Sequence, residues 1–284
     1  MKIGIIGAEN SHTVAIAKVL NVSKLVKGFS IDYVWGETEE VAKAAAQQGH
    51  IAHIVSDPRE MLGNIDALIV DHRHAKYHLK AALPFVKRGI PTFIDKPFCC
   101  RAAEGRAFLE TAKKAGTPVT SFSVLSAQAR YVKFIKRLAK AGEIIAGTTF
   151  GPCDVNSPYG GIFFYGIHQV DMALNAFGYD VSKVLVTKHA DNALAQLMYD
   201  DGKIVTLHLV KPDYRGFVIT ADTKNGIINE FIQFDADPYL KGIKTFTKMF
   251  KTRQEPISHA LILRPVEILE AMEKSIKSGK VEKL

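Results

Sequence analysis

A lysine at the end of a short apolar segment is the first residue that could carry chemistry. The run FIDKPF (93–98) places Lys96 directly after a predicted buried strand, between Asp95 and Pro97. A charge at a buried strand end is costly unless it has a partner or a task. Lys96 can give or take a proton, or bind a hydroxyl oxygen in its charged form. The alternative is a surface lysine after a strand, and the flanking Asp95 and Pro97 argue against it.

A second candidate segment is GGIFFYGIHQVDMALNAFG (160–178), in which His168 and Asp171 lie three residues apart. An imidazole and a carboxylate at this spacing could carry a proton or hold a substrate. The apolar pattern that follows predicts a helix from about Ile167 to Phe177.

The loop after the first predicted strand, GAENSH, could contact a dinucleotide. The fingerprint G-x-G-x-x-G lets backbone amides approach a pyrophosphate, but only Gly7 remains here, with Glu9 and His12 in the later positions. A carboxylate at Glu9 would repel a pyrophosphate, whereas Asn10, Ser11 and the helix N-terminus could donate hydrogen bonds to it. The alternative is a strand–helix turn that binds no nucleotide.

An acidic residue follows the second predicted strand. Glu37 could accept the ribose hydroxyls of NAD and would repel the 2′-phosphate of NADP. The run GETEE (36–40) contains no lysine or arginine to bind that phosphate. We therefore expect NAD rather than NADP, although Glu37 could also be a solvated loop residue.

The run DHRHAKYH (71–78) follows the fourth predicted strand and contains three histidines. We expect it to line a cofactor and to lead into a helix from about His74 to Arg88. His74 and His78 are four residues apart and could share a metal on a helix. No glutamate lies between them and no third ligand is evident, so we expect no metal site.

Strands and helices alternate through the first 120 residues. Strand-like segments at 2–7, 31–37, 50–55, 65–70, 91–95 and 118–124 are separated by helical patterns. This alternation predicts a doubly wound parallel sheet, whose ligands bind at the carboxyl ends of the strands. Residues 1–122 are expected to form this dinucleotide-binding Rossmann domain.

The pattern changes after residue 122. Two helices and a strand are followed by successive strand-like segments with hairpin signals at Asp201-Gly202 and Asn225-Gly226. Residues 123–284 are therefore expected to form an α+β domain for substrate binding and oligomerisation, with an open, mostly antiparallel sheet. For its last helix, within PVEILEAMEKSIKSGK, packing against the first domain is an alternative expectation.

Composition excludes several classes of function. The chain has 284 residues and a net charge of +8, but its basic residues lie on predicted helix faces, so we expect no nucleic-acid partner. No apolar run approaches 18 residues, and the short N-terminal apolar run is broken by glycine, so we expect neither a membrane span nor a signal peptide. Three cysteines are too few for a disulfide framework, which favours a cytoplasmic location.

The ordered set of motifs resembles the Gfo/Idh/MocA family of NAD(P)-dependent oxidoreductases. The resemblance rests on KIGIIGA (2–8), on HLKAALPFVKRGIPTFIDKP (78–97) and on GGIFFYGIHQVDMALNAFG (160–178), and it covers nearly the whole chain. It implies hydride transfer between a nicotinamide and a hydroxyl-bearing carbon of a sugar, an inositol or a related polyol. It also implies a homodimer or homotetramer formed through the C-terminal sheet.

The resemblance also implies roles for individual residues. Lys96 matches the lysine that binds or deprotonates the reacting hydroxyl, and His168 matches a proton carrier or substrate ligand. Tyr159 and Asp171 are the further expected substrate contacts. Expected cofactor contacts come from the strand-end loops of the first domain: Gly7, Ala8, Glu9, Asn10, Ser11, His12, Glu37, Asp71, His72, His74, His78, Asp95 and Lys96.

The sequence departs from the family pattern at a third motif position and in overall length. Many family dehydrogenases have an aspartate four residues before the histidine, where this chain has Phe164, and the chain is short for the family. Tyr165 could act as the acid or base instead, but in an extended segment its side chain would point away from that of residue 164. The alternative function is therefore a non-catalytic nucleotide- or sugar-binding relative that has lost redox activity.

Overall fold

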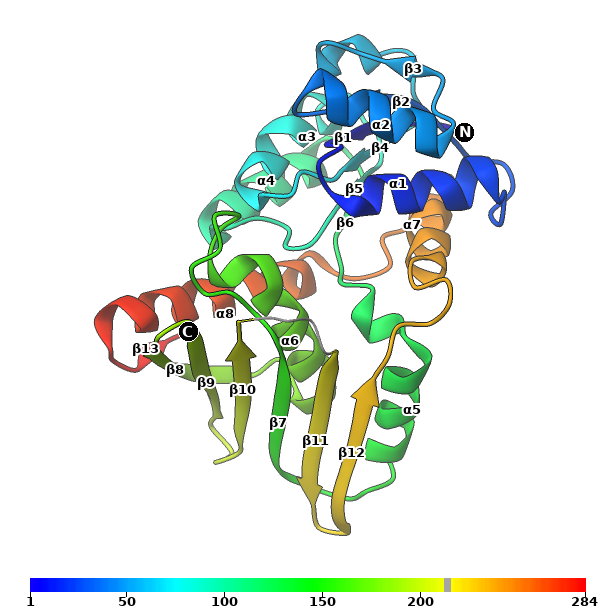
Figure 1. The fold of residues 1–284 in the computed structure, drawn as a ribbon. Helices are drawn as coiled ribbons and strands as arrows, with labels where there is room; N and C mark the ends of the chain where they lie inside the picture. Colours follow the sequence, from blue (N-terminus) through cyan, green and yellow to red (C-terminus); the bar gives the residue numbers. More distant parts are fainter. Residues whose placement is uncertain (212–215) are drawn as a thin grey trace. The chain divides into compact units, whose positions relative to one another are not determined.

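The computed structural model of the chain describes residues 1–211 and 216–284. The chain forms two compact units, coloured by sequence in Figure 1. The first unit contains Met1–Phe122 and Tyr239–Leu263, and the second contains Ser123–Pro238 and Arg264–Leu284. A segment from the later part of the chain thus belongs to the first unit.

The first unit is built on a six-stranded sheet in the order β3-β2-β1-β4-β5-β6, in which every neighbouring pair is parallel. Its strands are β1 (Lys2–Ile6), β2 (Ser30–Trp35), β3 (His53–Ile54), β4 (Ala67–Val70), β5 (Thr92–Ile94) and β6 (Val119–Thr120). Its helical segments are α1 (Ser11–Ala17), η1 (Lys18–Val22), α2 (Glu39–Gly49), η2 (Pro58–Met61), η3 (Ala75–Tyr77), α3 (His78–Val86), α4 (Ala102–Lys114) and α7 (Leu240–Thr252).

The central strands of this sheet are buried on both faces, as parallel strands covered by crossover helices must be. All four residues of β4 are buried, as are the last four of β1. Helix α7 adds Ile243, Phe246 and Phe250 to the same core. Its apolar spacing of three and four residues was a helix signal that the sequence prediction did not use.

The second unit contains a seven-stranded sheet in the order β12-β11-β7-β10-β9-β8-β13. Its strands are β7 (Ile144–Pro152), β8 (Val181–His189), β9 (Asn192–Tyr199), β10 (Ile204–Val210), β11 (Phe217–Thr223), β12 (Gly226–Ile232) and β13 (Glu282–Lys283). Its helical segments are η4 (Leu125–Ala127), α5 (Ala129–Leu138) and α6 (Ile162–Phe177), and α8 (His259–Ser278) ends in this unit. Among the strand pairs of the described residues in this sheet, β7–β10 is parallel and the others are antiparallel.

Two glycines allow the second sheet to approach its aromatic neighbours. A Cβ on Gly147 of β7 would lie 2.4 Å from the ring of Phe177 in α6, and a Cβ on Gly151 would lie 2.4 Å from the ring of Phe217. Helix α6 therefore packs on this face of β7, and Gln169 of α6 fixes the contact by accepting a hydrogen bond from Thr149 Oγ1 at 2.9 Å.

The expected fold class is confirmed: a parallel Rossmann sheet is followed by a mostly antiparallel sheet with helices. The prediction for α6 was wrong in one respect, because the helix begins at Ile162 rather than near Ile167. Gly161 precedes it with φ of 58° and no side chain caps the first turn, so the usual start signal is missing. Along the described 1–211 and 216–284, no helix has the length and apolar character needed to cross a membrane.

Candidate functional site

The carboxyl ends of three neighbouring strands bring the predicted cofactor residues of the first unit together. Strand β1 lies beside β4, and β4 lies beside β5, so Gly7, Asp71 and Asp95 follow adjacent strand ends. Gly7 has φ of +111°, and a Cβ there would lie 2.6 Å from backbone atoms of Asp71 and His72. Only glycine permits this close approach of the first loop to the fourth.

The carboxyl group of Asp71 is buried and surrounded by polar partners from the first loop. Asn10 caps α1, which Ser11 begins, and its Nδ2 donates to Asp71 Oδ1 at 2.8 Å. The Thr13 hydroxyl lies 2.6 Å from Asp71 Oδ2 and 2.8 Å from the carbonyl oxygen of Gly7. Thr13 was not among the predicted residues, because one threonine in a helix carries no recognisable signal.

Asp95 lies beside this group and gathers three nitrogen atoms. Its Oδ2 is 3.1 Å from His12 Nδ1, 3.3 Å from Asn10 Nδ2 and 3.8 Å from Lys96 Nζ. Asp95 is buried, and the side chain of Lys96 is 9% exposed. The predicted lysine therefore has a charged partner in a dry environment, where electrostatic interactions are strong.

The two buried aspartates differ in their affinity for protons. Burial and the nearby Asp95 charge raise the pKa of Asp71 well above its ordinary value. Burial alone would also raise the pKa of Asp95, but the positive charges of His12 and Lys96 outweigh it and lower that pKa. The pair therefore favours a neutral Asp71 beside a charged Asp95.

The same residues offer ligand atoms of the kind that bind cations. One atom each of His12, Asp71 and Asp95 lies within 4.8 Å of the others. Imidazole and carboxylate suit zinc or manganese. The ammonium of Lys96, however, already supplies positive charge at Asp95.

Glu37 joins the first loop to the end of β2. Its Oε2 accepts hydrogen bonds from the backbone amides of Ala8 and Glu9, both at 2.9 Å. Its Oε1 is buried and has no hydrogen-bond partner within the described residues. A buried acceptor without a donor is costly, so hydroxyl donors such as those of a ribose fit this position. The Glu9 carboxylate lies 3.6 Å from Arg73, which offsets its negative charge.

The three histidines after β4 have different environments. His78 is fully buried, with Nε2 2.8 Å from the carbonyl oxygen of His72 and Nδ1 3.1 Å from that of Pro97. It therefore braces the turn that carries Lys96. Burial lowers the pKa of His72 to about 3, so this ring is neutral. The predicted helix starts at His78, whereas His74 precedes it as the cap of a short 3₁₀ turn.

His168 occupies a mainly aromatic site in the second unit. Its ring is buried and lies 5.6 Å from that of Tyr165 and 5.7 Å from that of Phe217. Its Nδ1 lies 2.8 Å from the hydroxyl of Ser123. This hydrogen bond fixes the ring orientation, which a proton carrier or substrate ligand requires. Ser123 precedes η4 and was missed because it lies 45 residues away in sequence.

Asp171 ties α6 to the same segment. The Ser126 hydroxyl donates to Asp171 Oδ2 in a short hydrogen bond. Burial raises the pKa of Asp171 to about 6, although the bonds from Ser126 and Asn175 oppose that shift. Asp171 and His168 thus both hold the segment from Ser123 to Ser126 against α6.

Phe164 and Tyr165 lie on helix α6 rather than on an extended segment. The Phe164 ring is 5.1 Å from that of Tyr159 and 5.0 Å from that of Tyr165. Residues 164 and 168 share a helix face at a spacing of four, and Tyr165 reaches His168 at a spacing of three. The helical start therefore brings Tyr165 to His168, which the extended alternative would not predict.

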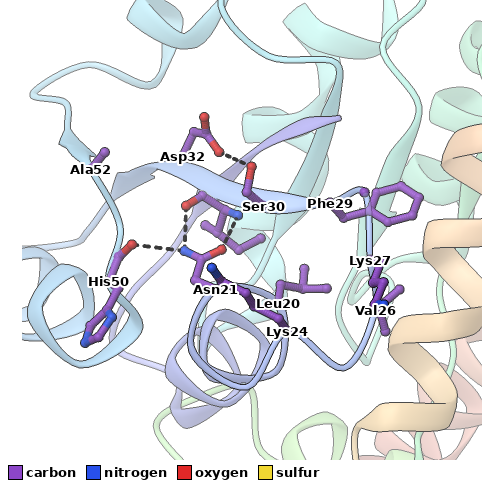
Figure 2. Close-up of a pocket in the computed structure, with 12 residues that line it drawn as sticks. Leu20, Asn21, Lys24, Val26, Lys27, Phe29, Ser30, Asp32, His50 and Ala52 are labelled. Carbon is purple, nitrogen blue, oxygen red and sulfur yellow. Dashed lines mark hydrogen bonds between the residues drawn. The ribbon is translucent and has the colours of Figure 1, made fainter.

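A hollow of about 520 Å³ lies elsewhere in the first unit, shown in Figure 2. Asn21, Lys24, Lys27 and His50 line it at the amino end of β2, where Ser30 begins the strand. Glu37 follows the opposite, carboxyl end of that strand. This hollow is therefore separate from the candidate site at the strand carboxyl ends.

Comparisons with known proteins agree with this geometry. Residues 1–122 match the Gfo/Idh/MocA oxidoreductase family, NAD-binding Rossmann fold. No protein of curated function matches the chain by sequence.

Solved structures share the fold at low identity. Myo-inositol 2-dehydrogenase from Lactobacillus plantarum is 16% identical with a TM-score of 0.85, covering 100% of this chain and 99% of that chain. Scyllo-inositol dehydrogenase from Lactobacillus casei is 13% identical with a TM-score of 0.85, covering 100% and 98%. An oxidoreductase from Agrobacterium radiobacter, in complex with NAD⁺, L-tartaric acid and magnesium, is 16% identical with a TM-score of 0.81, covering 100% and 98%.

The family match covers the loops that hold Gly7, Glu37 and Lys96. The strand order, the close approach at Gly7 and the acceptor at Glu37 are the features of a dinucleotide-binding sheet. Residues 1–122 are therefore similar to the NAD-binding Rossmann domain of the Gfo/Idh/MocA family of oxidoreductases.

Proposed function

We propose that this protein is an active NAD-dependent dehydrogenase that oxidises a hydroxyl-bearing carbon of a sugar, an inositol or a related polyol. The observation that carries the proposal is the Lys96 side chain, which is 9% exposed and whose Nζ lies 3.8 Å from Asp95 at the carboxyl end of β5. A lysine beside a carboxylate in a Rossmann domain is suited to proton exchange with an alcohol. The inositol dehydrogenases with the same fold support the substrate class.

The residues at the carboxyl ends of β1 and β2 fit NAD. Glu37 Oε1 would accept from the adenosine ribose hydroxyls, which would supply the hydrogen bonds this buried atom lacks. The 2′-phosphate of NADP would meet the same carboxylate and be repelled. The cofactor, when bound, supplies a hydride acceptor.

Lys96 acts as the base in this proposal. Lys96 takes the proton of the substrate hydroxyl as the carbonyl bond forms. His168, held by Ser123 at 2.8 Å, serves as a second proton carrier or as a substrate ligand, assisted by Tyr165. Tyr159 and Asp171 are the further proposed substrate contacts.

The experiment is a binding and turnover assay. Isothermal titration with NAD⁺ and NADP⁺ should give tighter binding of NAD⁺. Glu37→Ala should bring the dissociation constants of the two cofactors closer together. NADH absorbance at 340 nm should then increase with at least one member of a panel that contains myo-inositol, scyllo-inositol and common hexoses. Absence of NAD⁺ binding at millimolar concentration would contradict the proposal.

The second candidate is a nucleotide- or sugar-binding protein without turnover. Two observations favour it: Phe164 packs between Tyr159 and Tyr165, and Glu37 already occupies the amides of Ala8 and Glu9. This candidate predicts that NAD⁺ or a polyol raises the melting temperature while no NADH forms. Turnover that depends on Lys96 would exclude it.

We also propose a homodimer or homotetramer formed through the second sheet. His208, Phe150, Val218 and Phe231 form a row across β10, β7, β11 and β12. Phe150 is 47% exposed and Phe231 is 41% exposed, on the face that α6 does not cover. Light scattering should give an oligomer for the native chain and a smaller species for Phe150→Glu with Phe231→Glu; a native monomer would contradict the assembly.

A further inference from the structure

The hollow at the amino end of β2 is formed by three segments of the first unit. They are η1 with the loop after it, the first residues of β2, and the turn that follows α2. In Figure 2, His50 and Ala52 lie across the hollow from Val26 and Lys27. Its volume of about 520 Å³ falls in the range of about 300–1,000 Å³ that is typical of small-molecule pockets. The hollow is therefore large enough for a small organic molecule.

One asparagine ties the three segments together. Asn21 of η1 accepts a hydrogen bond through Oδ1 from the backbone amide of Ile31 in β2, at 2.8 Å. Its Nδ2 lies 2.8 Å from the carbonyl oxygen of Ile31, 3.0 Å from that of Gly49 and 3.1 Å from that of His50. Walls that are fixed before a ligand arrives reduce the cost of binding it. The hollow is thus preorganised, as a binding site requires.

The floor of the hollow is apolar. Leu20 and Ile31 line it and are buried members of the core of the first unit. Val26 and Phe29 also line it, and they are partly buried against the same core. A ligand with an apolar body would cover these side chains and remove apolar surface from water, which favours binding.

The rim of the hollow carries more positive than negative charge. Lys24 and Lys27 line it, and neither side chain has an ion pair or hydrogen bond to another described residue. The lining has one carboxylate among the described residues, that of Asp32, which accepts a hydrogen bond from the Ser30 hydroxyl. His50 adds an imidazole, which can donate a hydrogen bond. An anionic group is therefore the electrostatic complement of this rim.

Two residues of the rim have a backbone conformation that favours glycine. Four non-glycine residues of the described chain have positive φ, and two of these are Lys24 at 49° and His50 at 50°. His50 ends α2 in the left-handed conformation, which is usually adopted there by glycine. A side chain is present at both positions although glycine would adopt the conformation without strain. This observation supports a use for both side chains at the hollow.

We propose that the hollow is a second binding site, which takes a small organic anion with an apolar body. The apolar body covers Leu20 and Ile31, and the anionic group interacts with Lys24 and Lys27. Glu37 follows the opposite end of β2, so this site is separate from the NAD site. Binding needs neither NAD⁺ nor turnover, and the proposal is therefore independent of the proposed dehydrogenase activity.

Isothermal titration with two probes of equal chain length tests the chemistry of the site. Octanoate carries a negative charge, and octylamine carries a positive one. Octanoate should bind the native protein with a dissociation constant in about the millimolar range or tighter, and about fivefold or more tighter than octylamine. Saturating NAD⁺ should not displace it. Equal or tighter binding of octylamine, displacement by NAD⁺, or no octanoate binding at about 10 mM would overturn the proposal.

Charge-reversed and filled variants locate the site. Lys24→Glu with Lys27→Glu should weaken octanoate binding about tenfold or more, because two attractions become repulsions. Ala52→Trp places a large ring in the hollow, keeps both lysines, and should weaken binding about fivefold or more. Lys113→Glu with Lys114→Glu, at the exposed end of α4, is the matched control and should bind as the native protein does.

The variants also distinguish this site from general attraction to a basic protein. Circular dichroism should show that each variant is folded. Native affinity in the charge-reversed variant or in Ala52→Trp would overturn the assignment of the hollow. An equal loss in the α4 control would overturn it as well, because octanoate would then respond to net charge rather than to the two lysines of the rim.

Discussion

The surroundings of Lys96 and of His168 differ in kind. In the first unit, Lys96 faces a buried carboxylate that is itself hydrogen-bonded to Asn10 and His12. In the second unit, His168 lies among the rings of Tyr165 and Phe217, and its Nδ1 is 2.8 Å from the Ser123 hydroxyl. One region is a connected set of groups that bind protons, and the other is a packed aromatic site that fixes one ring.

This difference suggests that the two regions have different roles in the proposed reaction. A connected acid–base set can accept a proton and release it, because each group has a neighbour to pass it to. A ring that lies among aromatic side chains and is hydrogen-bonded to a hydroxyl is well oriented to hold a substrate. We therefore expect the first region to control the rate of the chemical step and the second mainly to position substrate.

The largest expected effect is the loss of Lys96. Lys96→Ala should lower kcat/KM about 10³-fold or more, because both the base and the charge partner of Asp95 are removed. The measurement is NADH formation with the best polyol of the panel. Lys114→Ala, at the exposed end of α4, is the matched control and should retain native activity. A Lys96→Ala enzyme within tenfold of native would assign the chemistry to another residue.

A smaller effect is expected at His168. His168→Asn should reduce kcat/KM about 10- to 100-fold, with most of the change in KM if the ring binds substrate. Steady-state kinetics over a range of polyol concentrations separates the two parameters. Ser123→Ala, which removes only the hydroxyl at 2.8 Å from Nδ1, should have a weaker effect of the same kind. A decrease in kcat/KM as large as that of Lys96→Ala would contradict the proposal that the two regions have different roles.

The sequence predicts the first region better than the second for a physical reason. Lys96 follows a short buried strand, and the alternation of strands and helices fixes which end of the sheet it faces. Asp71 and Asp95 lie close together because β4 and β5 are adjacent strands. The alternation of strands and helices implies that adjacency, but it does not specify side-chain contacts. Ser123 could not be found because nothing local links it to His168.

Helix α6 shows the limits of local signals in another way. Its first turn is apolar and uncapped after Gly161, so the pattern gives no start before the periodic residues. Packing decides the boundary instead: Ile162 and Phe163 are buried, and burial of such side chains stabilises the first turn by about 1.5–3 kcal/mol for each. The relation of Tyr165 to His168 depends on that turn and could therefore not be derived from the pattern.

The pH dependence of stability should also distinguish the two regions. Asp171 has a pKa raised to about 6, so the native state keeps a proton that the unfolded chain loses near pH 4. Stability from this group is complete below pH 4 and is lost as the pH rises through 6, by about 1–3 kcal/mol. Urea unfolding at pH 4, 5, 6 and 7 should show that loss in the native protein relative to Asp171→Asn. If the free energy of unfolding changed with pH in the same way for the native protein and for Asp171→Asn, this contribution of Asp171 would be contradicted.

The smallest expected effect is at Phe164. Phe164→Leu removes ring contacts with Tyr159 and Tyr165 at about 5 Å but keeps an apolar side chain. Aromatic pairs contribute about 0.5–1.5 kcal/mol each, so urea unfolding should show a loss of about 1 kcal/mol, with kcat/KM within threefold of native. If Phe164 only packs, His168 keeps its ring orientation through Ser123 and the second region still positions substrate. A kcat loss above tenfold would mean that the aromatic site takes part in the chemical step, because a packing defect of this size cannot account for it.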